Sequence, residues 1–207
     1  MGSMIGGMKV IALTGGIATG KSTLLAMMKE GVRDLWGYDC DEAAQRLLGD
    51  LDCLREIQES LGESILTPEM ELDRPRLRKL VFENSALREK LEEVIHPKLR
   101  KECLEKVEEC RRNQRTTLFV ADVPLLFEGG FDFGQEINLV VATSDATQRT
   151  RLKARSHFDD RMISSILLAQ LPIMEKVVRA DVVFWNEGRK AVLQRQLSRF
   201  LDNIFNS

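Results

Sequence analysis

The sequence Gly15-Gly16-Ile17-Ala18-Thr19-Gly20-Lys21-Ser22 decides how the rest of the chain is interpreted. It satisfies the pattern Gly-x-x-x-x-Gly-Lys-[Ser/Thr]. In this pattern the glycines let the backbone curl, so that successive N–H groups face inward and hold phosphate oxygens. The Lys21 ammonium reaches the β- and γ-phosphates, and the Ser22 hydroxyl is a ligand for Mg²⁺. The stretch therefore predicts a P-loop, a site for a nucleoside triphosphate with magnesium.

The residues on either side of the loop support this interpretation. Lys9–Thr14 is a short apolar, β-branched run that predicts a buried parallel strand, and Lys21–Lys29 has the apolar spacing of a helix. A strand before the loop and a helix after it form the context that a P-loop requires. A glycine-rich turn that binds no nucleotide is the alternative.

Strand and helix patterns alternate along much of the remaining chain. Further strands are expected at Leu35–Tyr38, Thr116–Val123, Ile137–Ala142 and Asp181–Trp185, and helices at Glu42–Leu48, Ala146–Arg155, Asp160–Leu171 and Gly188–Ile204. Asp41 is the expected N-cap of the helix Glu42–Leu48. The alternation predicts an α/β fold, a three-layer α/β/α P-loop NTPase with a central parallel sheet.

One stretch departs from this alternation. Residues 51–112 are strongly charged and have helical spacing throughout, with Pro97 predicted either to start a new helix or to kink a continuous one. We expect a helical acceptor-binding insertion over residues 51–112 and a helical lid over residues 146–178. The nucleotide-binding core is expected to comprise residues 8–50, 113–145 and 179–207.

Composition excludes several classes of protein. The 207 residues carry 30 Lys and Arg against 32 Asp and Glu, a net charge of −2, and this balance lacks the basic excess of a dedicated nucleic-acid binder. No apolar run reaches the ~18 residues of a membrane span, and the first eight residues lack the features of a signal peptide. The four cysteines have no zinc-site spacing, which favours reduced thiols in the cytoplasm. A monomer or weak homo-oligomer that binds small molecules, neither nucleic acid nor membrane, is expected.

A small-molecule kinase fits these features best among P-loop proteins. The chain has no Asn-Lys-x-Asp or Asp-x-x-Gly motif at a strand end, as a GTPase switch would need, and a mechanical ATPase needs a longer domain. A cluster of cations, which suits a lid that neutralises charge on the transferring phosphoryl group, comprises Arg149, Arg151, Lys153, Arg155 and Arg161. A solvated helix face is the alternative interpretation of this cluster.

Three aspartates, Asp39, Asp41 and Asp122, are candidates for the acidic groups of such a site. Asp41 follows the second predicted strand and so lies on the nucleotide side of a parallel sheet, where a carboxylate positions an acceptor hydroxyl and takes its proton. A helix cap is its alternative role. Asp122 ends the third strand, where it is either a Walker-B carboxylate for Mg²⁺ or an ordinary strand-end aspartate.

At the level of motifs the chain resembles the dephospho-coenzyme A kinases. The matching segments occur in family order over nearly the whole chain and are Leu13–Ile17, Gly20–Thr23, Asp39–Asp41, Ile95–Pro97, Val123–Glu128, Arg151 with Arg155, Ala169–Gln170, and Ala180–Asp181 with Asn186–Gly188. The resemblance implies an ATP-dependent transfer of a phosphoryl group, with Mg²⁺, to the ribose 3′-hydroxyl of dephospho-CoA. This is the last step of coenzyme A biosynthesis.

The resemblance also implies roles for individual residues. Lys21 would stabilise the transferring phosphate, Asp41 would act as base, and Arg151 would be the transition-state arginine of the lid, with Arg161 as a supporting cation. His96 and the insertion around it would hold dephospho-CoA. The implied ATP site comprises Gly16, Ala18, Thr19, Gly20, Lys21, Ser22, Thr23, Arg155, Asn186 and Gly188, with Ser22 as the magnesium ligand.

The chain departs from the family pattern in its P-loop. The family often has Gly-Ser where this chain has Ala18-Thr19, so one position lacks the conformational freedom of glycine. Two other functions stay open at this point. One is a P-loop kinase of the nucleoside monophosphate type, and the other is a nucleotide-binding regulatory module that has no acceptor.

Overall fold

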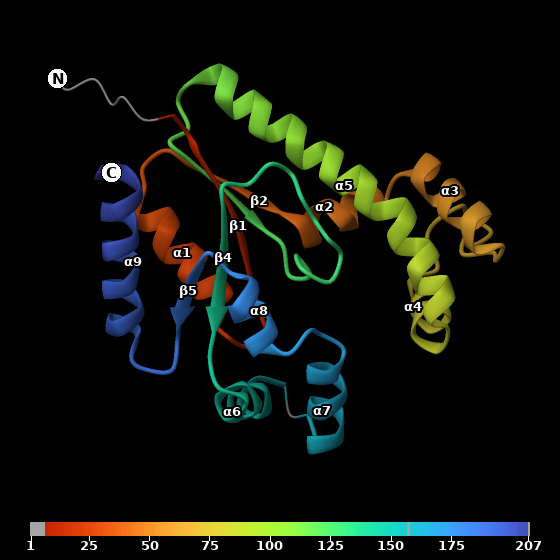
Figure 1. Ribbon diagram of the computed structural model, residues 1–207. Helices are drawn as coiled ribbons and strands as arrows, with labels where there is room; N and C mark the ends of the chain where they lie inside the picture. The colour runs from red at the N-terminus through yellow and green to blue at the C-terminus, as the bar shows by residue number, and fades with distance from the viewer. Residues whose placement is uncertain (1–6, 157, 207) are drawn as a thin grey trace. The chain divides into compact units, whose positions relative to one another are not determined.

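The structure, a computed structural model, describes residues 7–156 and 158–206 (Figure 1). Residues 1–6 make up most of the segment that was tested for a signal peptide. These residues and residue 207, the last residue of the expected core, lie outside the described residues. The strands are β1 (Lys9–Gly15), β2 (Leu35–Asp39), β3 (Leu118–Asp122), β4 (Ile137–Ala142) and β5 (Val182–Trp185). The helices are α1 (Lys21–Gly31), α2 (Cys40–Leu47), α3 (Leu51–Leu61), α4 (Arg74–Glu83), α5 (Ser85–Asn113), α6 (Asp145–Ser156), α7 (Asp160–Leu168), α8 (Ile173–Arg179) and α9 (Lys190–Asn206).

The five strands form one parallel sheet in the order β2-β3-β1-β4-β5. The strand that leads into the P-loop, β1, lies at the centre and pairs with β3 through Lys9↔Leu118 and with β4 through Ile11↔Ile137. Parallel neighbours need crossover connections, so the strands that flank β1 come from distant parts of the chain. The predicted α/β fold with a central parallel sheet is confirmed.

The central strands are buried on both faces. Val10, Ile11, Ala12 and Leu13 are all fully inaccessible to solvent, and the same holds for Leu118–Ala121. Successive side chains of a strand point to opposite faces, so a continuous apolar run requires cover on both sides of the sheet. This burial fixes β1, and with it the start of the P-loop.

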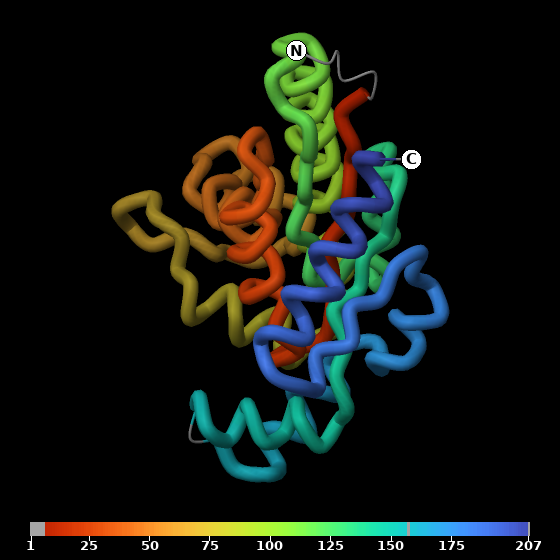
Figure 2. The backbone as a smooth tube through the Cα atoms, turned by 90° about the vertical axis from the view of Figure 1, so that its left-hand side faces the viewer, coloured from red at the N-terminus to blue at the C-terminus, as the bar shows by residue number. Residues whose placement is uncertain are grey.

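Helices α1 and α9 cover one face of the sheet (Figures 1 and 2). Leu24 and Met28 of α1 and Leu197 and Phe200 of α9 belong to one buried cluster with alternate residues of β1, β3 and β4. The ring of Phe200 meets that of Phe184 edge-on, with their centroids 5.6 Å apart. Burial of this side of α1 holds the helix whose first turn forms part of the P-loop.

The described chain divides into two compact units. Residues up to Tyr38 and from Lys106 onward form one unit, which contains the P-loop, and Asp39–Glu105 form the other. The second unit is mainly helical, and its buried residues include Leu54, Ile57 and Leu77. No helix of the described residues is both long enough and apolar enough to cross a membrane.

Several expected boundaries differ from the structure. Asp39, not Asp41, is the N-cap of α2, because its carboxylate accepts a hydrogen bond from the Glu42 N–H at 3.0 Å and the helix begins one residue after it. The helix expected at Asp160–Leu171 ends at Leu168. A separate helix, α8, follows Pro172, and the last helix begins at Lys190 instead of Gly188.

Of the two outcomes weighed for Pro97, the structure shows a single helix. Helix α5 runs without interruption from Ser85 to Asn113 with Pro97 in its interior. Proline has no N–H, so α5 lacks one backbone hydrogen bond at this point.

Candidate active site

The P-loop ends in a helix N-terminus that no side chain caps. Gly20 is the N-cap of α1 and has a left-handed backbone (φ +101°), which explains why a glycine is needed there. A Cβ at this position would also collide with the side-chain amide of Asn186. Aspartate side chains cap α3, α4 and α7, whereas the first N–H groups of α1 receive no side-chain acceptor. A helix start of this kind is suited to bind an anion.

Three successive carbonyl groups of the P-loop, those of Ile17, Ala18 and Thr19, bind side chains from other parts of the protein. Gln148 Nε2 donates to the carbonyl of Ile17 at 2.8 Å, and Asn186 Nδ2 donates to that of Thr19 at 2.8 Å. Arg151 Nη1 donates to the carbonyls of Ala18 and Thr19 at 3.1 and 3.2 Å. In a trans peptide the N–H points opposite to the carbonyl, so the contacts to Ile17 and Thr19 turn the N–H groups of Ala18 and Gly20 to the other side of the loop. The N–H of Thr19 instead donates to the Gly16 carbonyl at 3.4 Å. The arrangement directs N–H groups toward a phosphate.

Ala18 has an unfavourable backbone conformation for an alanine. Its φ is +59°, in the left-handed region that glycine occupies without strain. An alanine here therefore carries a conformational cost that a glycine would avoid.

Lys21 forms an ion pair with Asp122. Lys21 is the first residue of α1 and Asp122 the last of β3, which is paired with β1 in the register Leu13↔Asp122. Both side chains are largely buried, with exposed fractions of 17% and 10%. The structure thus brings together the P-loop lysine and the carboxylate that ends β3.

The predicted lid cations divide into three groups. Arg149 and Lys153 pair within the lid, Arg149 with Asp145 and the Ser164 hydroxyl, and Lys153 with Asp160. Arg151 contacts the P-loop, as described above, and also donates to the Asn186 carbonyl at 2.9 Å. The exposed side chains of Arg155 and Arg161 have no ion pair with any described residue. Two of the five cations thus remain available to a bound ligand.

A carboxylate anchors the loop after β5 to the start of α6. Glu187 accepts hydrogen bonds from the Thr143 hydroxyl at 2.5 Å, from the Thr147 hydroxyl, and from the N–H and hydroxyl of Ser144 at 2.8 and 2.7 Å. The hydroxyls of Thr143 and Thr147, followed by the groups of Ser144, lower the pKa of Glu187 to about 2. Its neighbour Asn186 binds the P-loop, so one short segment after β5 contacts both the P-loop and the start of α6. Gly188, the second predicted site residue in this segment, is exposed.

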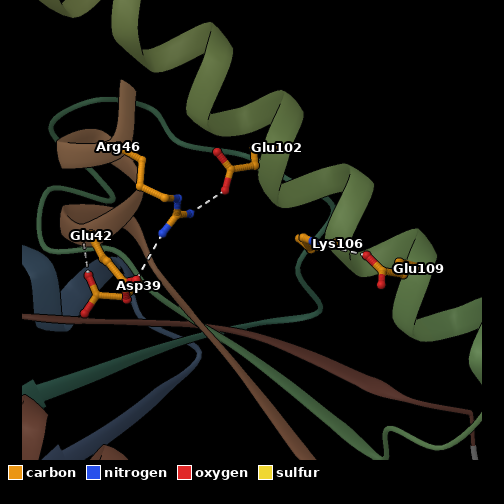
Figure 3. A network of polar contacts seen from close by, with 6 residues as sticks. All are labelled: Asp39, Glu42, Arg46, Glu102, Lys106 and Glu109. Carbon is orange, nitrogen blue, oxygen red and sulfur yellow. Dashed lines mark hydrogen bonds and ion pairs between the residues drawn. The ribbon is translucent and has the colours of Figure 1, made fainter. Parts of the chain in front are cut away.

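The two aspartates after β2 have different surroundings. Asp39 is engaged as the cap of α2, beside a polar network in which Arg46 binds Glu42 at 3.2 Å and Glu102 at 2.6 Å (Figure 3). Asp41 is exposed, and its carboxylate makes no hydrogen bond or ion pair within the described part of the chain. Only Asp41 is therefore free to accept a proton from a ligand.

The other predicted residues are placed as follows. Gly16 is buried, the hydroxyl of Thr19 donates to the Gly16 carbonyl at 2.8 Å, and Ser22 and Thr23 are exposed in the first turn of α1. His96 is half-buried in α5, in the helical unit that does not contain the P-loop.

Sequence analysis did not single out three buried or half-buried polar residues near the loop. Gln148 and Gln170 both bind the backbone of Ile17, and Lys176 is fully inaccessible. Lys176 Nζ lies 2.7 Å from Glu128 and donates to the Pro124 carbonyl at 3.0 Å. Gln170 and Glu128 lie in the segments that carry the family resemblance, and this resemblance could have marked them as functional residues. For Gln148 and Lys176 the sequence offers only a polar residue within a helix.

Comparison with known proteins identifies the family. The family model for dephospho-CoA kinase matches residues 9–191. A dephospho-CoA kinase of Geobacillus kaustophilus is 40% identical over 193 residues, which cover 92% of this chain and 94% of that protein. The chain belongs to the dephospho-CoA kinase family. A second dephospho-CoA kinase, from Enterococcus faecalis, is 35% identical over 198 residues that cover 94% of this chain and 96% of that protein.

A solved structure has the same fold. The Thermus thermophilus protein TT1252 superimposes with a TM-score of 0.77 at 29% identity, covering 96% of this chain and 98% of that one. Dephospho-CoA kinases use ATP to phosphorylate dephospho-CoA in the last step of coenzyme A biosynthesis. The resemblance inferred from the motifs, the kinase class and the P-loop fold are thereby confirmed.

Proposed function

We propose that this chain transfers the γ-phosphoryl group of ATP to the ribose 3′-hydroxyl of dephospho-CoA at the P-loop described above. The observation that carries this proposal is the orientation of the loop, whose carbonyls are bound by Gln148, Arg151 and Asn186. The N–H groups of Ala18 and Gly20, opposite the bound carbonyls of Ile17 and Thr19, and the uncapped start of α1 then face the phosphates. Lys21, Ser22 and Thr23 continue this surface into the first turn of α1.

Lys21 and the arginines supply positive charge to the reaction. Lys21 leaves Asp122 to bind the β- and γ-phosphates and stabilises charge on the transferring group. Arg151 stands at the loop, and Arg155 and Arg161 are free to approach the phosphates when the lid of residues 146–178 closes. Positive charge brought to the transferring phosphoryl group, together with exclusion of water, favours transfer over hydrolysis.

Magnesium fits the oxygen ligands present here. Mg²⁺ prefers hard oxygen donors and is held in kinases by few protein groups together with substrate phosphates and waters. Ser22 offers an exposed hydroxyl, and Asp122 a carboxylate beside Lys21. No cluster of three or more His, Cys, Asp or Glu side chains suited to a metal occurs among the described residues. When bound, the ion would neutralise charge on the phosphates.

Asp41 is the proposed general base. Its carboxylate is exposed and not engaged by other described residues, while the neighbouring Asp39 is used as a helix cap. A carboxylate that accepts the proton of the attacking hydroxyl raises the rate by about 10²–10⁴-fold. The helical insertion of residues 51–112, with His96, would hold the dephospho-CoA moiety.

The proposed setting follows from the substrates. Both are small molecules, and the four cysteines are buried and form no disulfide, which supports a reducing cytoplasm. The proposed assembly is a monomer or weak homo-oligomer that binds neither nucleic acid nor membrane. The proposed core comprises residues 8–50, 113–145 and 179–207.

An acceptor panel tests the function. ADP release is measured with Mg²⁺-ATP and, in parallel, dephospho-CoA, AMP, CMP or shikimate, and the phosphorylated position is located by NMR. We expect turnover with dephospho-CoA alone and phosphate on the 3′-oxygen. A preference for any other acceptor would overturn the proposal, as would ATP binding without acceptor-dependent turnover.

A further inference from the structure

We infer that Gln148 and Gln170 act together as positioning residues that fix the P-loop through the backbone of Ile17. This pair is called the glutamine clamp below. The inference rests on the proposed function, because it assumes that ATP binds the P-loop. Neither glutamine touches the reacting groups, and both act through the loop.

Each glutamine takes one polar group of the same residue. Gln148 Nε2 donates to the Ile17 carbonyl at 2.8 Å, and Gln170 Oε1 accepts from the Ile17 N–H at 3.0 Å. The backbone partners fix the orientation of both amides, because a carbonyl needs a donor and an N–H needs an acceptor. The peptide groups on both sides of Ile17 are therefore held in one orientation.

Burial strengthens the contact that Gln148 makes. Gln148 is only 4% exposed, and its amide lies so close to Gly16 that a Cβ there would stand 2.6 Å from Nε2. A buried hydrogen bond has little competition from water, and its loss leaves a carbonyl without a partner. The carbonyl of Ile17 is trans to the N–H of Ala18, so Gln148 also sets the direction of a phosphate-facing N–H.

The two glutamines come from opposite ends of the helical pair α6–α7. Gln148 lies in the first turn of α6, and Gln170 follows α7, so that the helical pair α6–α7 begins and ends on Ile17. Between the two glutamines, side chains of α6 bind side chains of α7: Arg149 binds Ser164 and Lys153 binds Asp160. The shape of the P-loop is thus tied to the base of the lid, and the clamp serves the phosphates of ATP and not the acceptor.

Substitution by glutamate tests the two contacts separately, because both variants add the same charge and differ only in the hydrogen bond that they keep or lose. Gln170→Glu keeps an acceptor for the Ile17 N–H, whereas Gln148→Glu places an acceptor against the Ile17 carbonyl. Both add one negative charge beside the same residue, so the difference between them reports the hydrogen bond. Gln148→Met and Gln170→Met remove each contact without charge, and Gln194→Glu on the exposed side of α9 is the control for charge alone.

Affinity is measured by calorimetry for ATP and for inorganic tripolyphosphate, which has the phosphates without the nucleoside. We expect both Met variants to bind each ligand about 5- to 10-fold more weakly, the loss of roughly one hydrogen bond. Gln148→Glu should bind at least 10-fold more weakly than Gln170→Glu. The KM for dephospho-CoA should stay within twofold of wild type, and the calorimetric stoichiometry, which loss of folded protein would lower, should stay at the wild-type value.

Two results would overturn the clamp. One is binding of tripolyphosphate by the Met variants at wild-type affinity, and the other is equal binding by the two Glu variants. A Lys21→Ala arm separates this failure from that of the proposed function. If Lys21→Ala binds tripolyphosphate like wild type, the P-loop assignment fails and the clamp with it. If Lys21→Ala loses binding and the Met variants do not, the clamp alone is wrong.

Discussion

The ammonium of Lys21 is paired with the carboxylate of Asp122, so a phosphate must compete with a protein anion for the P-loop lysine. Removal of the lysine should therefore weaken nucleotide binding, whereas removal of the aspartate charge should not weaken it. Lys21→Ala should weaken binding of ATP more than 10-fold, because the cation that meets the phosphates is lost. Asp122→Asn should bind ATP as tightly as wild type or up to about 3-fold more tightly, because a competing negative charge is removed.

Calorimetry in EDTA tests this pair, since a magnesium contribution of Asp122 is then absent. Weaker ATP binding by Asp122→Asn under these conditions would show that the ion pair does not compete with phosphate. Repetition with Mg²⁺ separates the two roles considered for Asp122.

Replacement of Asp41 by Asn should reduce catalysis without a matching loss of binding. If Asp41 takes the proton of the acceptor, kcat should fall by about 10²–10⁴-fold while the KM for ATP changes little. Asp39→Asn is the matched control two residues away. Asparagine is as good an N-cap as aspartate, so this variant should keep α2 and its activity. An unchanged kcat in Asp41→Asn would rule out the base.

Ala18→Gly should stabilise the protein. The left-handed backbone at Ala18 costs an alanine about 1 kcal/mol, and a glycine relieves most of this strain. Ala26→Gly on the exposed side of α1 is the control and should destabilise by about 1 kcal/mol, because the same change there weakens a helix. Urea unfolding of both variants measures the change in the free energy of unfolding, which should have opposite signs for the two. Destabilisation by Ala18→Gly would contradict the strained conformation.

Lys176→Met should lower the free energy of unfolding by roughly 3 kcal/mol, the cost of breaking a buried ion pair by removing one member. Lys176 is fully buried and binds both Glu128 and the Pro124 carbonyl. Lys190→Met, at the exposed start of α9, should change stability by less than about 0.5 kcal/mol. Chemical denaturation measures both. Equal stabilities for the two variants would mean that the buried pair contributes nothing.

Acid should destabilise the wild type through Glu187. Hydrogen bonds from Thr143 and Thr147, then Ser144, lower the pKa of Glu187 from 4.5 to about 2 in the folded protein. Between these two values the unfolded chain binds a proton that the folded chain does not. Stability from this group is therefore complete above pH 4.5 and is lost as the pH falls toward 2.

Glu187→Gln lacks this titration and tests the assignment. Between pH 4.5 and 2 its midpoint for urea unfolding should fall less steeply than that of the wild type. Parallel profiles for the two proteins would refute the low pKa of Glu187.

The sheet and the P-loop followed from the sequence because they rest on local patterns. Runs such as Lys9–Gly15 and Ile137–Ala142 are apolar on both faces, and only a parallel sheet with two covered faces accepts them. The glycines, Lys21 and Ser22 lie in consecutive positions, so their chemistry is visible without the fold. Both predictions used information within a few residues of the chain.

Features that depend on contacts between distant residues were missed. The contact between Gln148 and Ile17 joins residues 131 positions apart, and no local pattern in α6 marks a glutamine that binds a loop. The short α8 follows Pro172 directly and has a buried lysine at its centre, which contradicts an amphipathic pattern. Asp39 and Asp41 are both acceptable caps by sequence, and only the end of β2 decides between them.

The central place of β1 has a consequence for synthesis on the ribosome. β1 is the first strand made, and its neighbour β3 follows roughly 110 residues later, after the helical unit. At about 5–20 residues per second, β1 waits on the order of 5 to 20 s for a partner. During that time its apolar run is exposed to any chaperone or aggregating chain nearby. Chains that stop within the helical unit would therefore contain a finished P-loop sequence and no sheet to hold it.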